Sequence, residues 1–511
     1  MRSLKTMMPM KTNRSLITTT CAAILMSVGT LATAGDIPNH PSQLSFDELV
    51  FEAPVASEFR HELSSGVPVF MAPSDEFPLV TIRLSFKGGA YMEGPDQAGL
   101  AGMTGAMIRS GGSATMSPSE LDEEFDFMAA NVSVGISARV ANASINCLTS
   151  NLDEAFAMFM DMLLNPRFDS ERLEVRRGQM LESIKTRDDD GLQIALREMN
   201  FLMWGEDHFE ARQPTKASIE GYSVEDMKDL HKRIFNPANL MVSVTGDFKE
   251  KDMLAFLEDA FAGWEPGAVS PAIPSPTHTF EPGVYYYEKD QPQVQVLIGH
   301  RGVQRDDPNA VKVEVMNQIL GGSGFTSRIT NSVRTREGLA YTAGSAMSSR
   351  IEYPGMFMSY FFTKVATTAL ATRLVFDEFE TIQTEAASTE EIGTIQNSLI
   401  ETFPRTFESK AAMMSLFMSD ERTGRAKDHW QTYRDRVRSV DADDVQQAAN
   451  DYLHPEDAVI LVVGPWEEIK KGNADSEADA ARIATMEEFF DGQATEIPQR
   501  DPETLEPKSG K

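Results

Sequence analysis

The chain has 511 residues, of which 41% are apolar and 24% charged, a composition that is typical of globular proteins and excludes global disorder. This length suits about three domains of roughly 150 residues each. The formal net charge of −30 argues against nucleic acid as a partner, because phosphate backbones repel acidic surfaces. The same charge is compatible with attraction of basic peptides, or simply with solubility.

The first segment, residues 1–34, predicts an export signal. It has a basic start without acidic residues, an apolar run and a small-residue cleavage pattern at Ala32-Thr33-Ala34. The run is shorter than the about 20 residues of a membrane span, and no later stretch is long enough, so we expect no span after signal removal. An uncleaved anchor stays open. Removal leaves Cys147 as the only cysteine, and export without disulfides favours a bacterial periplasm.

The elements that follow do not alternate as in a parallel α/β sheet. Residues 79–90 predict a strand, and 131–150 predict two adjacent antiparallel strands. Residues 151–164 and 171–190 have the apolar spacing of helices. A Val-rich strand follows at 235–248. The pattern therefore indicates an α+β fold in which helices pack on one face of an antiparallel sheet.

The second half of the chain repeats the first. Residues 294–303 predict an opening strand, and 453–466 repeat the order of 235–248, namely a Pro turn, a Val-rich strand and a Gly. The period is far longer than that of a solenoid repeat, so we expect two tandem homologous domains. The expected divisions are a first domain at 45–265, a linker with five prolines at 266–283, a second domain at 284–466 and an acidic tail at 467–511, with a helical pattern around 477–490.

Residues 84–112 resemble the strand, Gly-rich turn and metal-binding helix of the pitrilysin/insulinase family of zinc peptidases. In active members the tripeptide GLA precedes His-x-x-Glu-His, in which the two His bind zinc and the Glu activates water. Those positions are Gly102, Gly105 and Ala106 in this chain, and none of them can bind a metal or move a proton.

The rest of the family's metal site is also absent from the sequence. The resemblance puts the third ligand, a Glu on a later helix, at Ser183 and a supporting acid at Arg176. The eight His offer no other pair at i, i+4 that could form a shifted zinc helix. We therefore expect no metal in this chain and no peptidase activity of the chain alone.

Residues 320–346 resemble the family's C-terminal signature, in which an Arg is followed seven residues later by a Tyr. The matching residues are Arg334 at the end of a helix and Tyr341 at the start of a strand, with Arg328 and Arg336 as competing arginines. The resemblance implies that this pair binds the substrate carbonyl in trans at the zinc of another domain set. Guanidinium and phenol are good donors to a carbonyl that gains negative charge. Taken singly, either residue could instead serve a structural role.

Residues 130–135 resemble the family's substrate-binding edge strand, to which a peptide adds as a further strand. Asn131 and Val132 would carry this contact, and an ordinary sheet strand is the alternative interpretation.

The resemblance as a whole implies the short-chain, two-domain branch with a mitochondrial-processing-peptidase-like fold. It implies the substrate-binding or regulatory subunit of a periplasmic heterodimeric zinc metallopeptidase, with a homologous zinc-bearing partner and a peptide substrate. The alternative is a homodimer that binds peptides or acts as a scaffold without enzymatic activity. An enzyme of another kind has little support, because the sequence contains no phosphate loop, nucleophile elbow or Cys–His framework.

Overall fold

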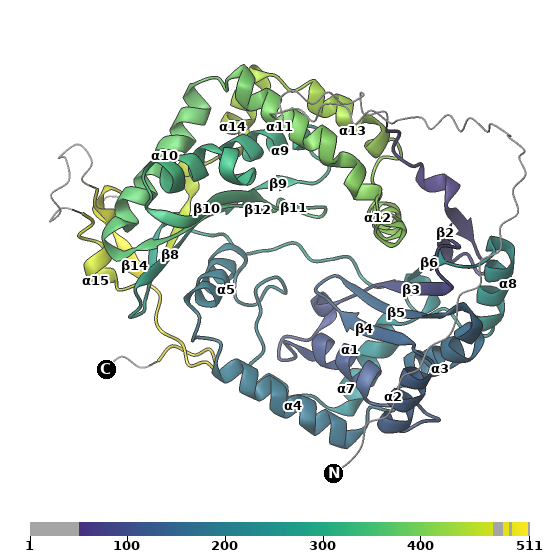
Figure 1. Cartoon of the computed structure of the whole chain (residues 1–511). Coiled ribbons are helices and arrows are strands. Elements are labelled where there is room, and N and C mark those ends of the chain that lie inside the picture. The colour runs from purple at the N-terminus through teal and green to yellow at the C-terminus, as the bar shows by residue number, and fades with distance from the viewer. Residues whose placement is uncertain (1–50, 474–483, 490–492, 509–511) are drawn as a thin grey trace, which may run out of the picture. The chain divides into compact units, whose positions relative to one another are not determined.

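A computed structural model describes residues 51–473, 484–489 and 493–508 of the chain, and two six-stranded sheets form the framework of these residues (Figure 1). The expected export signal at 1–34 lies outside the described residues. Within them, no helix combines the length and the apolar character that crossing a membrane requires.

The first sheet is built from the first half of the chain in the order β1-β2-β6-β3-β5-β4. Its strands are β1 (Arg60–Glu62), β2 (Pro68–Pro73), β3 (Leu79–Lys87), β4 (Asn131–Ile136), β5 (Val140–Leu148) and β6 (Leu240–Gly246). The antiparallel pair predicted at 131–150 is β4 and β5, with Asn131 opposite Asn146. β2 and β6 run parallel, so the sheet is mixed rather than purely antiparallel.

The described residues of the first half contain eight α-helices. They are α1 (Leu100–Ser110), α2 (Pro118–Phe127), α3 (Leu152–Leu164), α4 (Ser170–Lys185), α5 (Gly191–Trp204), α6 (Lys216–Gly221), α7 (Val224–Ile234) and α8 (Glu250–Ala260). Of these, α2, α4, α5, α6 and α7 begin at side-chain caps. The helical pattern at 171–190 ends earlier than its spacing suggests, at Lys185. A turn follows, and Asp190 then starts α5 by accepting hydrogen bonds from the backbone of Leu192 and Gln193.

The second sheet is built from the second half in the order β10-β12-β8-β13-β7-β14. Its strands are β7 (Gly283–Glu288), β8 (Gln293–Arg301), β10 (Ala340–Met347), β12 (Met356–Lys364), β13 (Val459–Gly464) and β14 (Ala494–Glu496). A separate short pair joins β9 (Val303–Gln304) and β11 (Ser349–Arg350). Every residue of β13 is buried, because both faces of this sheet are covered.

The helices of the second half are α9 (Ala310–Asn317), α10 (Thr368–Thr384), α11 (Thr389–Thr402), α12 (Lys410–Thr423), α13 (His429–Arg438), α14 (Ala442–Tyr452) and α15 (Trp466–Ile469). Two π-helical turns, Gln318–Gly322 and Thr330–Arg336, lie between α9 and β10. The α+β class with two similar sheet domains is therefore confirmed.

The two halves exchange helices across their sheets. Helix α5, from the first half, packs on the second sheet, where Ile194 and Met199 join a core with Leu297 and Leu461 (Figure 1). The opposite face of that sheet carries Ile298 and other side chains that pack on helices of the second half. Each sheet therefore has its own helices on one face, as predicted, and a helix from the other half on the second face.

Helix α12, from the second half, makes the reciprocal contact with the first sheet. Its Met414 and Phe417 pack with Phe70 and Ala72 of β2. Arg422 of the same helix donates to the backbone carbonyl oxygen of Ser85 at 3.0 Å. Burial of this guanidinium, for which no carboxylate partner is present among the described residues, lowers the pKa of Arg422 to about 10.

The linker and the tail run along the surface of these cores. Residues 264–282 form no helix or strand. In the tail, β14 adds to the sheet parallel to β7, and Arg500 pairs with the buried Glu198 of α5 at 3.2 Å. The helical pattern expected around 477–490 falls largely outside the described residues.

Candidate functional site

Arg334 and Tyr341 lie in contact at one end of the second sheet. Arg334 is in the last turn of the π-helical segment Thr330–Arg336, and Tyr341 is the second residue of β10. Between them the chain turns at Gly338, whose φ of 64° is a left-handed conformation that glycine adopts without strain. The guanidinium carbon of Arg334 lies 4.6 Å from the centroid of the Tyr341 ring. The predicted pair is therefore brought together by a short local turn.

The two competing arginines are already paired. Arg328 forms a bidentate pair with Glu391, at 2.7 and 3.1 Å, and Arg336 pairs with Glu378 at 3.0 Å. The side chain of Arg334, in contrast, makes no hydrogen bond or ion pair to another residue that the structure describes, and its partners are aromatic faces. Its five N–H donors are therefore available to an acceptor from outside the chain.

Phe325 completes this group and was missed by the sequence analysis. Its ring centroid lies 4.5 Å from the Arg334 guanidinium, so the arginine sits between Phe325 and Tyr341. Both rings are exposed, 68% for Phe325 and 79% for Tyr341. A cation between two aromatic faces is held electrostatically while its edge stays free to donate. Phe325 belongs to the Gly-rich turn of the motif, but nothing in the local spacing indicates this contact.

A shallow groove of about 440 Å³ adjoins the pair. Its walls come from the start of β8, the turn before β10 and the end of β12, and they include Arg334, Tyr341, Phe362 and Lys364. β10 is the edge strand of its sheet within the described residues. The groove thus offers cationic and phenolic donors at the start of the edge strand β10.

The positions of the family's zinc helix fall on α1. Gly102 is exposed with open space around it, Ala106 is half-buried, and Gly105 is buried against β4. A side-chain carbon at Gly105 would lie 3.0 Å from the backbone nitrogen of Ile136 and 3.2 Å from the Cα of Gly135. Glycine at this position therefore lets the strand approach the helix closely.

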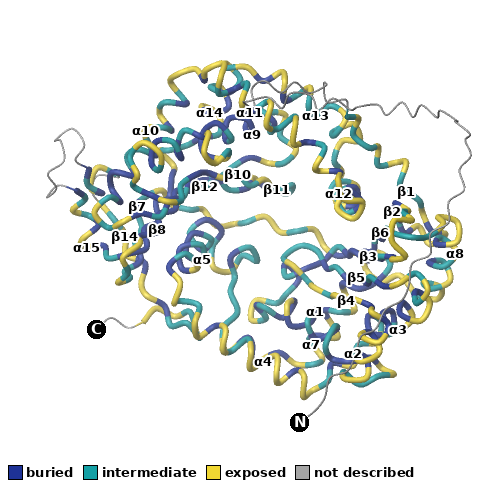
Figure 2. Tube along the Cα trace, in the orientation of Figure 1, coloured by how far each residue is buried: buried dark blue, intermediate teal, exposed yellow. Residues whose placement is uncertain are grey.

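The other two positions, Arg176 and Ser183, lie on α4. Both are exposed, and Figure 2 shows that most of this helix faces solvent, with only Leu173 and Ile184 buried. Arg176 donates to Gln179 at 3.0 Å. Glycine, alanine, arginine and serine provide none of the zinc ligands that proteins use, so the residues of this site do not fit the metal.

One group of potential metal ligands is present elsewhere in the described residues. His454, Glu456 and Asp457 gather in the turn after α14, far along the chain from α1 and α4. Their carboxylates are exposed. Exposed carboxylates in a turn are common without a metal, so this group does not replace the lost site.

The predicted substrate-binding strand is β4, the edge of the first sheet within the described residues. Asn131 is exposed at its start, while the Val132 side chain is buried. The backbone carbonyl oxygen of Val132 accepts a hydrogen bond from Nε of Arg109 at 3.0 Å, and Arg109 also pairs with Asp122 at 2.7 Å. A strand added at Val132 would have to displace this arginine.

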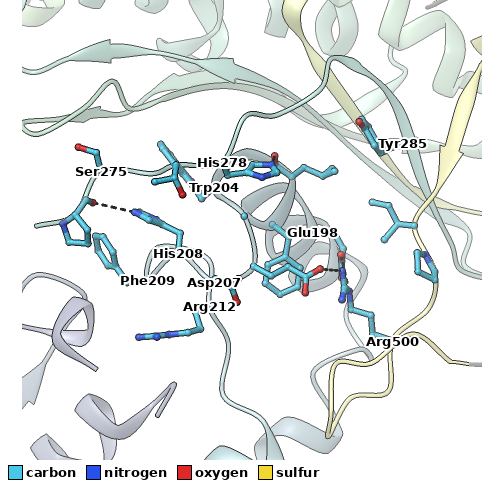
Figure 3. Close-up of a pocket in the computed structure, with 18 of the residues that line it drawn as sticks. Glu198, Trp204, Asp207, His208, Phe209, Arg212, Ser275, His278, Tyr285 and Arg500 are labelled. Carbon is cyan, nitrogen blue, oxygen red and sulfur yellow. Dashed lines mark hydrogen bonds and ion pairs between the residues drawn. The ribbon is translucent and has the colours of Figure 1, made fainter. Parts of the chain in front are cut away.

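A larger cavity, of about 730 Å³, lies where α5, the linker and the tail meet (Figure 3). Trp204, Phe209 and other aromatic residues line it, and Glu198 faces Arg500 across one end. Burial raises the pKa of Glu198, and the neighbouring arginines oppose this shift. The buried carboxylates of this cavity already form ion pairs, Glu198 with Arg500 and Glu93 with Arg212, each with an N···O distance of 3.2 Å. Neither of these two buried carboxylates is therefore free to act as a catalytic group.

Comparison with protein-family models identifies both halves. Residues 69–209 match the model for insulinase (peptidase family M16), and residues 221–399 match the model for the peptidase M16 inactive domain. The chain belongs to the insulinase family. Within this family it is a member without the zinc-binding His-x-x-Glu-His motif.

Curated relatives cover most of the same region. The chain is 26% identical over 333 residues to the "non-peptidase homolog YmxG" of Helicobacter pylori, which covers 64% of this chain and 76% of the relative. It is 24% identical over 325 residues to the "uncharacterized zinc protease SCO5738" of Streptomyces coelicolor, covering 62% and 70%. The relatives of this chain thus include a protein named as a non-peptidase and a protein named as a zinc protease.

Solved structures share the fold of this insulinase-family chain. A peptidase M16 inactive domain from Pseudomonas fluorescens has a TM-score of 0.71 at 22% identity, covering 80% of this chain and 97% of that one. The periplasmic protease PqqL from Escherichia coli has a TM-score of 0.69 at 17% identity, covering 84% of this chain and 48% of that one. At these identities the likeness establishes the two-domain architecture alone.

Proposed function

We propose that this chain is the non-catalytic, substrate-binding or regulatory subunit of a heterodimeric zinc peptidase, to whose active site it supplies Arg334 and Tyr341. The observation that carries the proposal is the contrast between two sites. The zinc positions on α1 and α4 have no ligand atoms, whereas Arg334 is unpaired among the described residues and lies beside an exposed phenol.

The chemistry of the pair suits a peptide carbonyl. Zinc in the partner subunit would supply the electrophile and the activated water. Arg334 and Tyr341 would donate hydrogen bonds to the scissile carbonyl oxygen as it gains negative charge. The guanidinium is charged at any physiological pH, so it donates without a proton transfer. Losing one such donor typically costs about 3 kcal/mol of transition-state stabilisation.

We further propose that the pair of subunits works in the periplasm on peptide substrates. Support comes from the signal-like residues 1–34 and from the fold shared with a protein named as the periplasmic protease PqqL. The name "non-peptidase homolog" of the Helicobacter pylori relative agrees with a chain that does not hydrolyse peptides alone. The edge strand β4 would guide the peptide through Asn131 and, if Arg109 moves, Val132.

The experiment is a pull-down of the tagged chain from its native periplasm, followed by metal analysis and peptidase assays of the complex. We expect a homologous subunit with intact His-x-x-Glu-His, and about one zinc per pair. Arg334→Ala and Tyr341→Phe should each lower turnover by about 100-fold without releasing the partner. Arg336→Ala is the matched control, because Arg336 is already paired with Glu378.

Two results would overturn the proposal. The first is metal-dependent proteolysis by the purified chain alone. The second is a stable homodimer that recruits no zinc-bearing partner and binds peptides equally well after Tyr341→Phe, which would establish the scaffold alternative instead.

A further inference from the structure

A second large cavity lies within the second half of the chain and shares no lining residue with the groove at Arg334 and Tyr341. It has a volume of about 940 Å³ and is lined by residues of α9, α11 and α13 and by the segments around Arg305 and Arg425. In a chain with a net charge of −30, this cavity gathers several cationic side chains. We call it the basic cavity and define it by Arg305, Arg425, His429 and Arg436.

His429 is contacted by guanidinium groups on both ring nitrogens. Its Nε2 lies 2.8 Å from Nη1 of Arg425, and its Nδ1 lies 3.1 Å from Nη2 of Arg436. Burial and these neighbouring arginines lower the pKa of His429 to about 4, so the ring is neutral at pH 7. A neutral imidazole has a single acceptor nitrogen, whereas a guanidinium only donates. One of the two contacts therefore sets donor against donor.

Of the three arginines that define the basic cavity, Arg436 has no carboxylate partner among the described residues. Arg425 pairs with Asp420 at 2.7 Å, and Arg305 pairs with Asp306 at 2.8 Å. Arg436 has no carboxylate oxygen within 4.0 Å in the described part of the chain, and its Nε is buried without a partner. Its Nη2 donates to the backbone carbonyl of His429 at 2.9 Å. Arg436 is half-buried, and a partly buried guanidinium without an ion-pair partner is a favourable site for an anion.

One carboxyl group in the wall, that of Glu314, interacts electrostatically with Arg436 without forming an ion pair. Glu314 accepts a hydrogen bond from the hydroxyl of Tyr433 at 3.0 Å, and burial raises the pKa of Glu314. It forms no ion pair with Arg436 among the described residues, although it lines the same cavity. The carboxylates of Asp306 and Asp307 also reach the wall, and they disfavour a ligand of high negative charge.

We propose that the basic cavity binds a small oxyanion whose oxygens accept hydrogen bonds from Arg436 and Arg425. The bidentate fork of a guanidinium matches a carboxylate or a phosphate. Phe403, Trp430 and Tyr433 form an aromatic part of the lining, and the volume leaves room for a compact organic body behind the charged group. The ligand class is therefore a small organic acid or inorganic phosphate of low charge. This inference is independent of the proposed peptidase partnership.

The test is a calorimetric titration of the full chain at pH 7.5 with two probes, benzoate and inorganic phosphate, each at constant ionic strength. We expect saturable binding of at least one probe, together with a rise in the thermal midpoint, because a ligand that binds only the folded state stabilises it. Binding of benzoate alone assigns the site to organic acids, and binding of phosphate alone assigns it to the inorganic ion.

Arg436→Met removes the unpaired guanidinium and keeps an apolar chain of similar reach. It should weaken binding at least 10-fold, as expected when a charge-assisted bidentate contact is lost. The matched control is Arg438→Met on the same helix, whose guanidinium is exposed and pairs with Asp435. Failure of the wild type to bind either probe overturns the proposal, and so does equal binding by Arg436→Met. The wild-type result decides even if the variant does not fold.

Discussion

Two glycines on α1 give a quantitative test of how closely β4 packs on the degenerate zinc helix. Gly102→Ala adds a methyl group that meets nothing within 4 Å, whereas Gly105→Ala places the same group 3.0 to 3.4 Å from the backbone of Gly135 and Ile136. Both changes gain about 1 kcal/mol of helix propensity. Only the second overpacks a backbone contact, which typically costs about 1–3 kcal/mol.

The propensity gain is common to both variants and cancels in their difference. We therefore expect Gly102→Ala to be more stable than wild type and to exceed Gly105→Ala by about 1–3 kcal/mol in free energy of unfolding. Urea unfolding followed by circular dichroism measures this difference, provided that the m-value is unchanged. Equal stability of the two variants would refute the reasoning, because it would mean that β4 moves away from the added methyl group without a measurable loss of stability. Active family members have a glutamate at the position of Gly105, and its side chain would meet the backbone of Gly135 and Ile136 in this structure.

Three other outcomes are expected. Phe325→Leu should lower turnover of the proposed heterodimer by about 2- to 5-fold through loss of a cation–π contact with Arg334, and should leave urea stability unchanged. Unchanged turnover would contradict this role of Phe325. Phe417→Ala on α12 should lower the free energy of unfolding by about 3–5 kcal/mol, because the Phe417 side chain is only 1% exposed. Ser419→Ala, at an exposed position of the same helix, should have little effect. Similar losses for both variants would argue against the packing of α12 on the first sheet. Burial lowers the pKa of His300 to about 4, so between pH 7 and pH 4 the unfolded chain binds a proton at this residue that the folded chain does not. The free energy of unfolding should therefore fall by about 3 kcal/mol over this range, and by less in His300→Asn. Parallel pH profiles of the wild type and the variant would show that His300 is not responsible.

The parts of the fold that depend on local pattern could be predicted from the sequence. The alternation in residues 131–150 predicts β4 and β5 because a strand's period of two is visible in its own residues. Arg334 and Tyr341 are also brought together locally, by the turn at Gly338, but the pair is identified by its resemblance to the family's C-terminal signature.

The features that sequence reasoning missed depend on segments far apart in the chain. Phe325 stacks on Arg334, and Arg109 bonds the carbonyl of Val132, but neither side chain differs in type from many exposed or half-buried neighbours. The apolar face of α5 predicts that the helix is buried, but periodicity does not say against which sheet. The basic cavity unites residues from 303 to 436, so no short motif contains it.

Because α5 and α12 are exchanged, each half of the chain covers an apolar sheet face of the other half. Expressed alone, the first half would expose Phe70 and Ala72 on a bare sheet, and a bare apolar sheet face is prone to aggregation. A single proteolytic cut in the linker at 266–283 should, in contrast, leave both fragments associated, because α5 and α12 each pack on the sheet of the other half. Gene fragments that separate the two halves should therefore yield products that do not fold independently.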